Sequence, residues 1–143
     1  MSTRSRIAFQ FSKNNIYSIY CHYDGYPSYV GKILLEHWNT PERVNALMVL
    51  GDLSQLGSEV GDKHDFDKHD HSSTSCLAYG RDRGEQNVSS VVCKTRAELV
   101  ELAKGCCGEF VYLFDGTSWF YSPVSDNKRT YFRKLTQKAC QKD

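Results

Sequence analysis

The stretch that determines the fold is residues 6–24, RIAFQFSKNNIYSIYCHYD. Two runs of alternating side chains, 6–11 and 16–24, flank the polar cluster 12–15. Alternation with a period of two is typical of half-buried strands, and a short polar connection between two such runs predicts a β-hairpin. This stretch therefore predicts the first two strands of a sheet.

The second strand of this hairpin has two chemically different faces, because successive side chains of a strand point to opposite sides of the sheet. One face is apolar, and we expect it in the core: Tyr17, Ile19, Cys21 and Tyr23. The other is polar and aromatic: Tyr20, His22 and Asp24. The second set suits a ligand better than a core.

Three helices are predicted by residues that cap helix N-termini, namely Ser28, Thr40 and Thr95. Each precedes apolar residues at helical spacing. Gly51, in the left-handed conformation, is expected to end the second helix, and Gly105 to end the third.

Between the second and third helices the periodicity vanishes. Residues 57–75 are rich in His and Asp and predict a flexible surface insertion. Short strands are predicted at 75–79 and 88–93, flanking a loop at 80–85. A second hairpin is predicted at 110–121, where two aromatic runs flank Asp-Gly.

The order of these elements predicts an α+β domain, with an antiparallel sheet built from β-hairpins and helices packed on one face. With 143 residues the chain has the length of one domain, so we expect residues 1–143 to form a single domain. A last short strand is expected near Tyr131.

Composition limits the possible partners. The net charge of +1 supplies no overall field for DNA or RNA, which argues against nucleic acid as a partner. The chain has neither a run of about 18 apolar residues nor a secretory signal, so we expect an intracellular protein without membrane contact. Its six cysteines include no C-x-x-C pair, which favours free thiols over a zinc site or disulfides.

The sequence gives little support for catalysis or metal binding. It contains no G-x-S-x-G, Walker, H-E-x-x-H or dinucleotide motif. Cys21 and His22 are neighbours in a strand and point to opposite faces, so they cannot act as a nucleophile and its base. The His and Asp residues of 57–75 are suitable metal ligands, but their spacing matches no defined loop. We therefore expect no enzymatic activity, cofactor or metal site.

Anion binding is the chemistry that the sequence supports best. Arg4 and Arg6 open the first strand on one face, where the hairpin can place them beside the polar face of the second strand. Arg81 and Arg83 lie between Gly80 and Gly84. Guanidinium groups match phosphate oxygens, and Tyr or His rings can stack on a base. The predicted ligand-binding set is Arg4, Arg6, Tyr20, His22, Asp24, Tyr26, Arg81, Arg83 and Glu85.

An alternative stays open for these arginines. They can form ordinary ion pairs with Asp24, Asp82 and Glu85, since such pairs are common at protein surfaces and contribute little energy.

Several segments carry a resemblance, above all STRSRI at 2–7, YCHYDGYP at 20–27 and GRDRGE at 80–85. With GKILLEH at 31–37 and LGDLS at 50–54, they resemble a family of small, largely uncharacterised proteins encoded by tailed bacteriophages and prophages.

The resemblance implies a phage accessory protein made in the cytoplasm of the infected bacterial host and acting by stoichiometric binding. Our first hypothesis is an anti-defence protein that sequesters a phosphate-bearing, nucleotide-like ligand such as an immune second messenger. A second is a protein–protein inhibitor of a host defence enzyme, with Trp38, Trp119 or the Tyr-rich strands as aromatic anchors. A third is a nucleotide-degrading hydrolase. A homo-oligomer is open under each hypothesis.

Overall fold

A computed structural model describes residues 2–70, 73–124 and 131–141. The strands are β1 Ser5–Ser12, β2 Asn15–Cys21, β3 Leu53–Gln55, β4 Leu77–Ala78, β5 Val91–Cys93, β6 Phe110–Phe114, β7 Trp119–Pro123 and β8 Arg133–Lys134. The α-helices are α1 Lys32–His37, α2 Pro41–Leu50, α3 Tyr79–Arg83 and α4 Arg96–Gly105. A π-helical turn, Pro27–Gly31, leads into α1, and 3-10 turns lie at Phe66–Lys68 and Ala139–Gln141.

All eight strands belong to one sheet, in the order β4-β3-β2-β1-β6-β7-β8 with β5 also paired to β2. The predicted hairpins are confirmed as the antiparallel pairs β1–β2 and β6–β7. The prediction of an antiparallel sheet is wrong in one respect, because β1 pairs with β6 and β2 with β3 in parallel. The helices between β2 and β3 return the chain to the same end of the sheet, and local alternation carries no sign of such a crossover.

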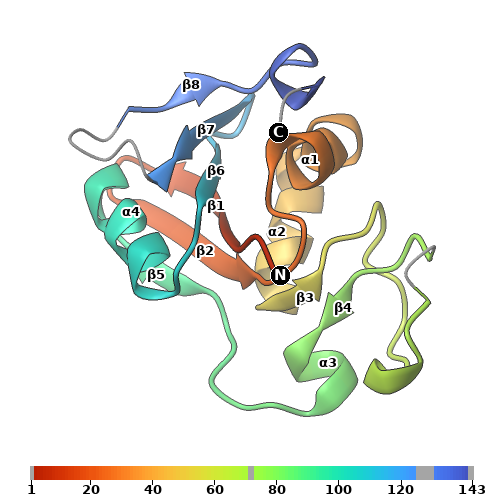
Figure 1. Ribbon diagram of the computed structural model, residues 1–143. Coiled ribbons are helices and arrows are strands. Elements are labelled where there is room, and N and C mark those ends of the chain that lie inside the picture. Colours follow the sequence, from red (N-terminus) through yellow and green to blue (C-terminus); the bar gives the residue numbers. More distant parts are fainter. Residues whose placement is uncertain (1, 71–72, 125–130, 142–143) are drawn as a thin grey trace.

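The helices cover both faces of the sheet, with α1 and α2 on one side and α4 on the other (Figure 1). The prediction of helices on one face is therefore wrong. The reason lies in β1, where Ile7 packs in the core under α1 and α2 while its neighbour Ala8 packs in the core under α4. A strand buried on both faces needs a cover on each. The α+β class itself is correct.

The helix ends show which local signals hold. The Oγ1 atoms of Thr40 and Thr95 each accept a hydrogen bond from the backbone N–H three residues on, as N-caps do. Ser28 is not an N-cap, because it lies inside the turn that begins at Pro27. Every helix in the described part of the chain is too short or too polar to cross a lipid bilayer.

Two further local predictions are corrected. Residues 80–85, expected as a loop, are mostly helical, because α3 spans Tyr79–Arg83 and only then ends at Gly84. Gly51 does end α2 with a positive φ, but its ψ of −162° lies outside the left-handed helical region. This conformation is essentially restricted to glycine.

Gly51→Ala should destabilise the fold by about 1–3 kcal/mol, the usual cost of such a backbone conformation for a residue with a Cβ. A Cβ at Gly51 would also lie 2.6 Å from the carbonyl oxygen of Val88. Urea denaturation measures the change. The control is Gly105→Ala, where a Cβ meets nothing within 4 Å and where we expect at most a small gain in stability. Equal effects of the two substitutions would contradict this account.

Candidate functional site

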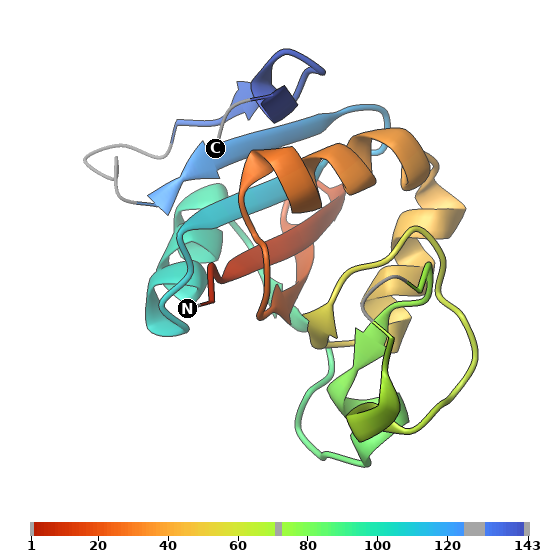
Figure 2. The same ribbon diagram turned by 45° about the vertical axis from the view of Figure 1, so that its right-hand side comes forward.

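A cleft of about 370 Å³ opens where the end of β2 meets β3, β4, α3 and the segment 57–75. These elements form a lobe at one end of the sheet (Figure 2). The cleft is lined by His22, Tyr23, Ser54, Phe66, Asp67, His69, Leu77, Tyr79 and Arg83. Two of the predicted ligand-binding residues, His22 and Arg83, therefore meet in one cavity although they lie far apart in the sequence.

Aromatic rings and one guanidinium group form the cleft walls. The rings of Phe66 and Tyr79 stack with their centroids 5.6 Å apart. The guanidinium of Arg83 lies 4.6 Å from the Phe66 centroid and 5.0 Å from that of Tyr79. On the β2 side, His22 and Tyr23 meet edge to face at 4.5 Å. This arrangement offers flat apolar surfaces and a positive charge in the same space.

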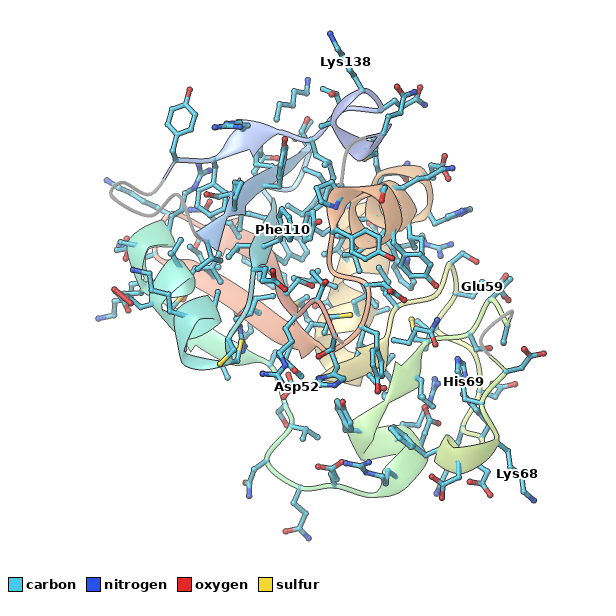
Figure 3. The ribbon with its side chains drawn as sticks, viewed as in Figure 1. Asp52, Glu59, Lys68, His69, Phe110 and Lys138 are labelled. Atoms are coloured by element: carbon cyan, nitrogen blue, oxygen red, sulfur yellow. The ribbon has the colours of Figure 1, made fainter. Side chains whose placement is uncertain are left out.

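The described part of the segment 57–75 is fixed to the rest of the domain by Arg81. Its guanidinium donates to the carbonyl oxygens of Val60 and Gly61, both at 2.8 Å, and to that of Cys76 at 2.9 Å. The segment thereby closes against β4, which places Phe66 and His69 at the cleft. Figure 3 shows His69 on this segment.

Asp82 completes this attachment from a buried position. It pairs with Arg81 at 2.9 Å and accepts from the backbone N–H of Ala78 at 2.8 Å and of His64 at 3.1 Å. The His64 ring in turn lies 2.8 Å, Nε2 to Nδ1, from that of His69. Burial raises the pKa of Asp82, but the hydrogen bonds from Arg81 and the backbone outweigh burial and hold it below its usual value.

Next to the cleft, the polar face of the β1–β2 hairpin forms a basic platform, which we define as Arg4, Arg6, Tyr20 and His22. Arg6 and Tyr20 are register partners, as the hairpin predicts. Arg6 is only 6% exposed and donates from Nε to the Ser18 hydroxyl at 2.9 Å. The Nε of Arg4 is buried without a hydrogen-bond partner. Neither arginine forms an ion pair with a carboxylate among the described residues.

Tyr20 and His22 join the platform to the cleft, because the Tyr20 hydroxyl lies 2.6 Å from His22 Nδ1. Burial raises the pKa of Tyr20 to about 12, against a smaller opposing effect of Arg4. Burial and then the charge of Arg4 lower the pKa of His22. At neutral pH the phenol is protonated and the imidazole neutral. We assign the shared hydrogen to Tyr20, so that Nε2 of His22 carries the ring N–H.

The other predicted ligand-binding residues lie elsewhere. The guanidinium of Arg81 is used in attaching the segment 57–75 and is not brought to the cleft. Tyr26 donates to the carboxylate of Asp24 at 3.1 Å, in the turn between β2 and α1. Glu85 pairs with Arg83 at the exposed rim of the cleft, so the ion-pair alternative holds for this arginine in the absence of a ligand.

Several cleft residues are absent from the predicted set. Tyr23 was expected in the core, yet it is 43% exposed because β2 ends at Cys21 and the alternation stops there. Phe66 lies in the segment expected as a flexible insertion. The signal that could have identified it is one large apolar ring within a run of charged residues.

The cysteines form neither disulfides nor a metal site in the described residues. The six cysteines are free, and burial raises the pKa of Cys21 to about 12 and that of Cys76 to about 11, so both thiols are protonated and poorly nucleophilic. Within 2–70, 73–124 and 131–141, no three His, Cys, Asp or Glu side chains gather as a metal ion would require. His71 lies outside the described residues.

The fold and the cleft define a class of protein: an α+β domain with a cleft walled by polar and aromatic side chains. Comparison adds no particular family to this description. No protein-family model matches the sequence, and no curated protein and no solved structure is significantly similar to it.

Asp82→Asn should lower the free energy of unfolding at pH 7 by about 1–3 kcal/mol, because buried hydrogen bonds to a charged acceptor are weakened. The folded-state pKa of Asp82 lies below the unfolded value of about 3.9. Its stabilisation is therefore present above that value and is lost as the pH falls through the folded-state pKa.

The difference in free energy of unfolding between wild type and Asp82→Asn should consequently become smaller from pH 5 to pH 3, as measured by urea denaturation. The control is Glu101→Gln, which removes an exposed ion pair to Lys104 and should change stability by less than about 0.5 kcal/mol. A gap that stays constant with pH would refute the role given to the Asp82 charge.

Arg4→Gln should raise the pKa of His22, because the charge of Arg4 is one of the two causes that lower it. The pKa should stay below the ordinary value of about 6.5, since the first cause, burial, is unchanged. An NMR titration of the His22 imidazole measures this pKa in the wild type and in the variant. Arg133→Gln, on β8, is the control and should leave this titration as in the wild type.

Proposed function

We propose that this protein binds and holds a phosphate-bearing, nucleotide-like ligand in the cleft, without converting it. One observation carries the proposal: at His22, a platform with two arginines that form no ion pair with a carboxylate of the described residues adjoins a cleft walled by Phe66 and Tyr79. A positive surface next to stacked rings suits a ligand that has both an anionic and an aromatic part.

Each part of such a ligand has a matching surface. The base stacks on the aromatic walls, where Arg83 already stacks on Phe66 and Tyr79. The phosphate accepts from Arg4 and from Nε2 of His22. Arg6 is too deeply buried to touch the ligand and contributes through its charge. A volume of about 370 Å³ is at the small end of the range for ligand sites, so the cleft holds one nucleotide unit.

Holding the ligand requires a preformed site rather than a reactive group. The walls are fixed by contacts among Phe66, Tyr79 and Arg83, which reduces the entropy lost on binding. The buried thiols of Cys21 and Cys76 are protonated and cannot serve as nucleophiles. In the cytoplasm of a phage-infected bacterium, stoichiometric capture of a nucleotide second messenger would disarm a host defence. This context rests on the resemblance of the sequence motifs.

The rival function, inhibition of a host enzyme, loses two of its expected anchors. Trp38 and Trp119 are both buried in the core. Their indole N–H groups donate to backbone oxygens, that of Trp38 to Gly57 and that of Trp119 to Trp38. They hold the fold together and cannot reach a partner protein.

Thermal denaturation against a panel of cyclic and linear nucleotides tests the proposal. A nucleotide at a hundred times its Kd should add about 2.7 kcal/mol of stability. Arg83→Gln should abolish the shift. Arg133→Gln is the matched control, because Arg133 also stacks on an exposed aromatic ring, that of Tyr131, and should leave the shift unchanged.

The bound nucleotide is then recovered from the denatured complex and identified by mass spectrometry. Recovery of one intact equivalent supports capture. Consumption of excess nucleotide by a trace of protein would show a hydrolase instead. A panel without any shift would contradict the proposal.

A further inference from the structure

The 3-10 turn Phe66–Lys68 brings a carboxylate to the cleft that the fold itself does not use. Asp67 directly follows Phe66, one of the two stacked rings, and is the only Asp or Glu among the residues that line the cleft. Its backbone N–H donates to the carboxylate of Asp65 at 2.9 Å, which fixes the turn. Among the described residues, the Asp67 side chain forms no ion pair and accepts no hydrogen bond.

Other polar groups of the cleft lining already have partners within the protein. The ring of His69 lies 2.8 Å from that of His64, Nδ1 to Nε2, and the guanidinium of Arg83 pairs with Glu85. The carboxylate of Asp67 remains for a ligand, and an ionised carboxylate only accepts hydrogen bonds. The part of the ligand beside Asp67 must therefore present N–H or O–H donors.

The position of Asp67 suits the edge of a stacked base. Its segment closes against β4, whereas His22, which we assign to the phosphate, follows β2. The strand β3 separates β4 from β2, so these two walls are about 10 Å, or two strand spacings, apart. In a nucleotide the Watson–Crick edge of the base lies opposite the sugar and phosphate. A base that stacks on Phe66 with its phosphate at His22 thus directs this edge away from β2, toward Asp67.

We propose that Asp67 recognises the base and that the ligand is a guanine nucleotide, an inference that rests on the nucleotide binding proposed above. The Watson–Crick edge of guanine presents two adjacent donors, N1–H and the N2 amino group. The two oxygens of one carboxylate can accept both, and such bidentate contacts to a charged group are strong as well as specific.

The same carboxylate disfavours the other common bases. Adenine and cytosine present one amino group beside a ring nitrogen whose lone pair would face a carboxylate oxygen. Uracil presents a single N–H between two carbonyl oxygens. Two acceptors that face each other repel, so the carboxylate selects guanine both by attraction and by exclusion of its competitors.

Isothermal titration calorimetry at pH 7 with guanosine, adenosine and xanthosine 5′-monophosphates tests the inference. Wild type should bind the guanosine nucleotide about 5- to 150-fold more tightly than the adenosine nucleotide, the discrimination expected of one bidentate base contact. Asp67→Asn should reverse the preference between guanosine and xanthosine nucleotides. The carboxamide offers one acceptor and one donor, which match N1–H and the C2 carbonyl of xanthine but not the two donors of guanine.

The matched control is Asp62→Asn, which removes the same charge from the same segment at a residue outside the cleft lining. It should bind all three nucleotides as wild type does. Asp67 is exposed, so its substitution leaves the core untouched.

Two results would overturn the guanine assignment alone. One is a wild type that binds the adenosine nucleotide as tightly as the guanosine nucleotide, and the other is a folded Asp67→Asn variant that still prefers guanosine to xanthosine. In either case a nucleotide is bound, and capture at the cleft stands if Arg83→Gln abolishes that binding. Failure of every nucleotide to bind would overturn both proposals.

Discussion

The parallel ladder between β1 and β6 joins two local hairpins into one sheet, and the remaining structure depends on it. It pairs Ser5 with Phe110 and Phe9 with Phe114, residues about a hundred positions apart. With β2 on its other edge, β1 has no free edge, and burial of Ile7 and Ala8 on opposite faces requires helices on both sides. Beyond the part covered by α4, the polar start of the same strand remains as the basic platform.

In the segment 57–75, hydrogen bonds take the place of a hydrophobic core. The segment 57–75 contains too few apolar residues to fold by burial, yet it forms one wall of the cleft. Arg81 and Asp82 hold it by hydrogen bonds to backbone atoms, which fix position as well as proximity. A buried ion pair adds little net stability but specifies one arrangement, and here that arrangement is the cleft.

The range of each interaction along the chain explains what the sequence could predict. The β1–β2 hairpin, the caps at Thr40 and Thr95 and the proximity of Arg6 to Tyr20 follow from local patterns, and all three are confirmed. The parallel ladder and the second helical layer depend on distant segments that no local period identifies. Within one motif, Arg81 serves the fold and Arg83 the cleft. Both arginines lie between the same two glycines, so the motif alone does not distinguish their roles. The position of the segment 57–75 determines which arginine holds the fold and which lines the cleft.

The strand β2 explains how one small sheet can present two separate surfaces. Its first half pairs with β5 and carries Tyr17 to an uncharged groove that Phe11 and Met48 also line, while its end delivers His22 to the cleft. The chain that leads from Arg83 back to β5 is held midway, because the carbonyl of Val88 accepts from the backbone N–H of Asp52 at 2.8 Å. The carboxylate of Asp52 in turn accepts from the backbone N–H of Tyr20 at 2.8 Å. The cleft and the β5 edge are therefore built on the same hydrogen-bonded framework, although they share no lining residue.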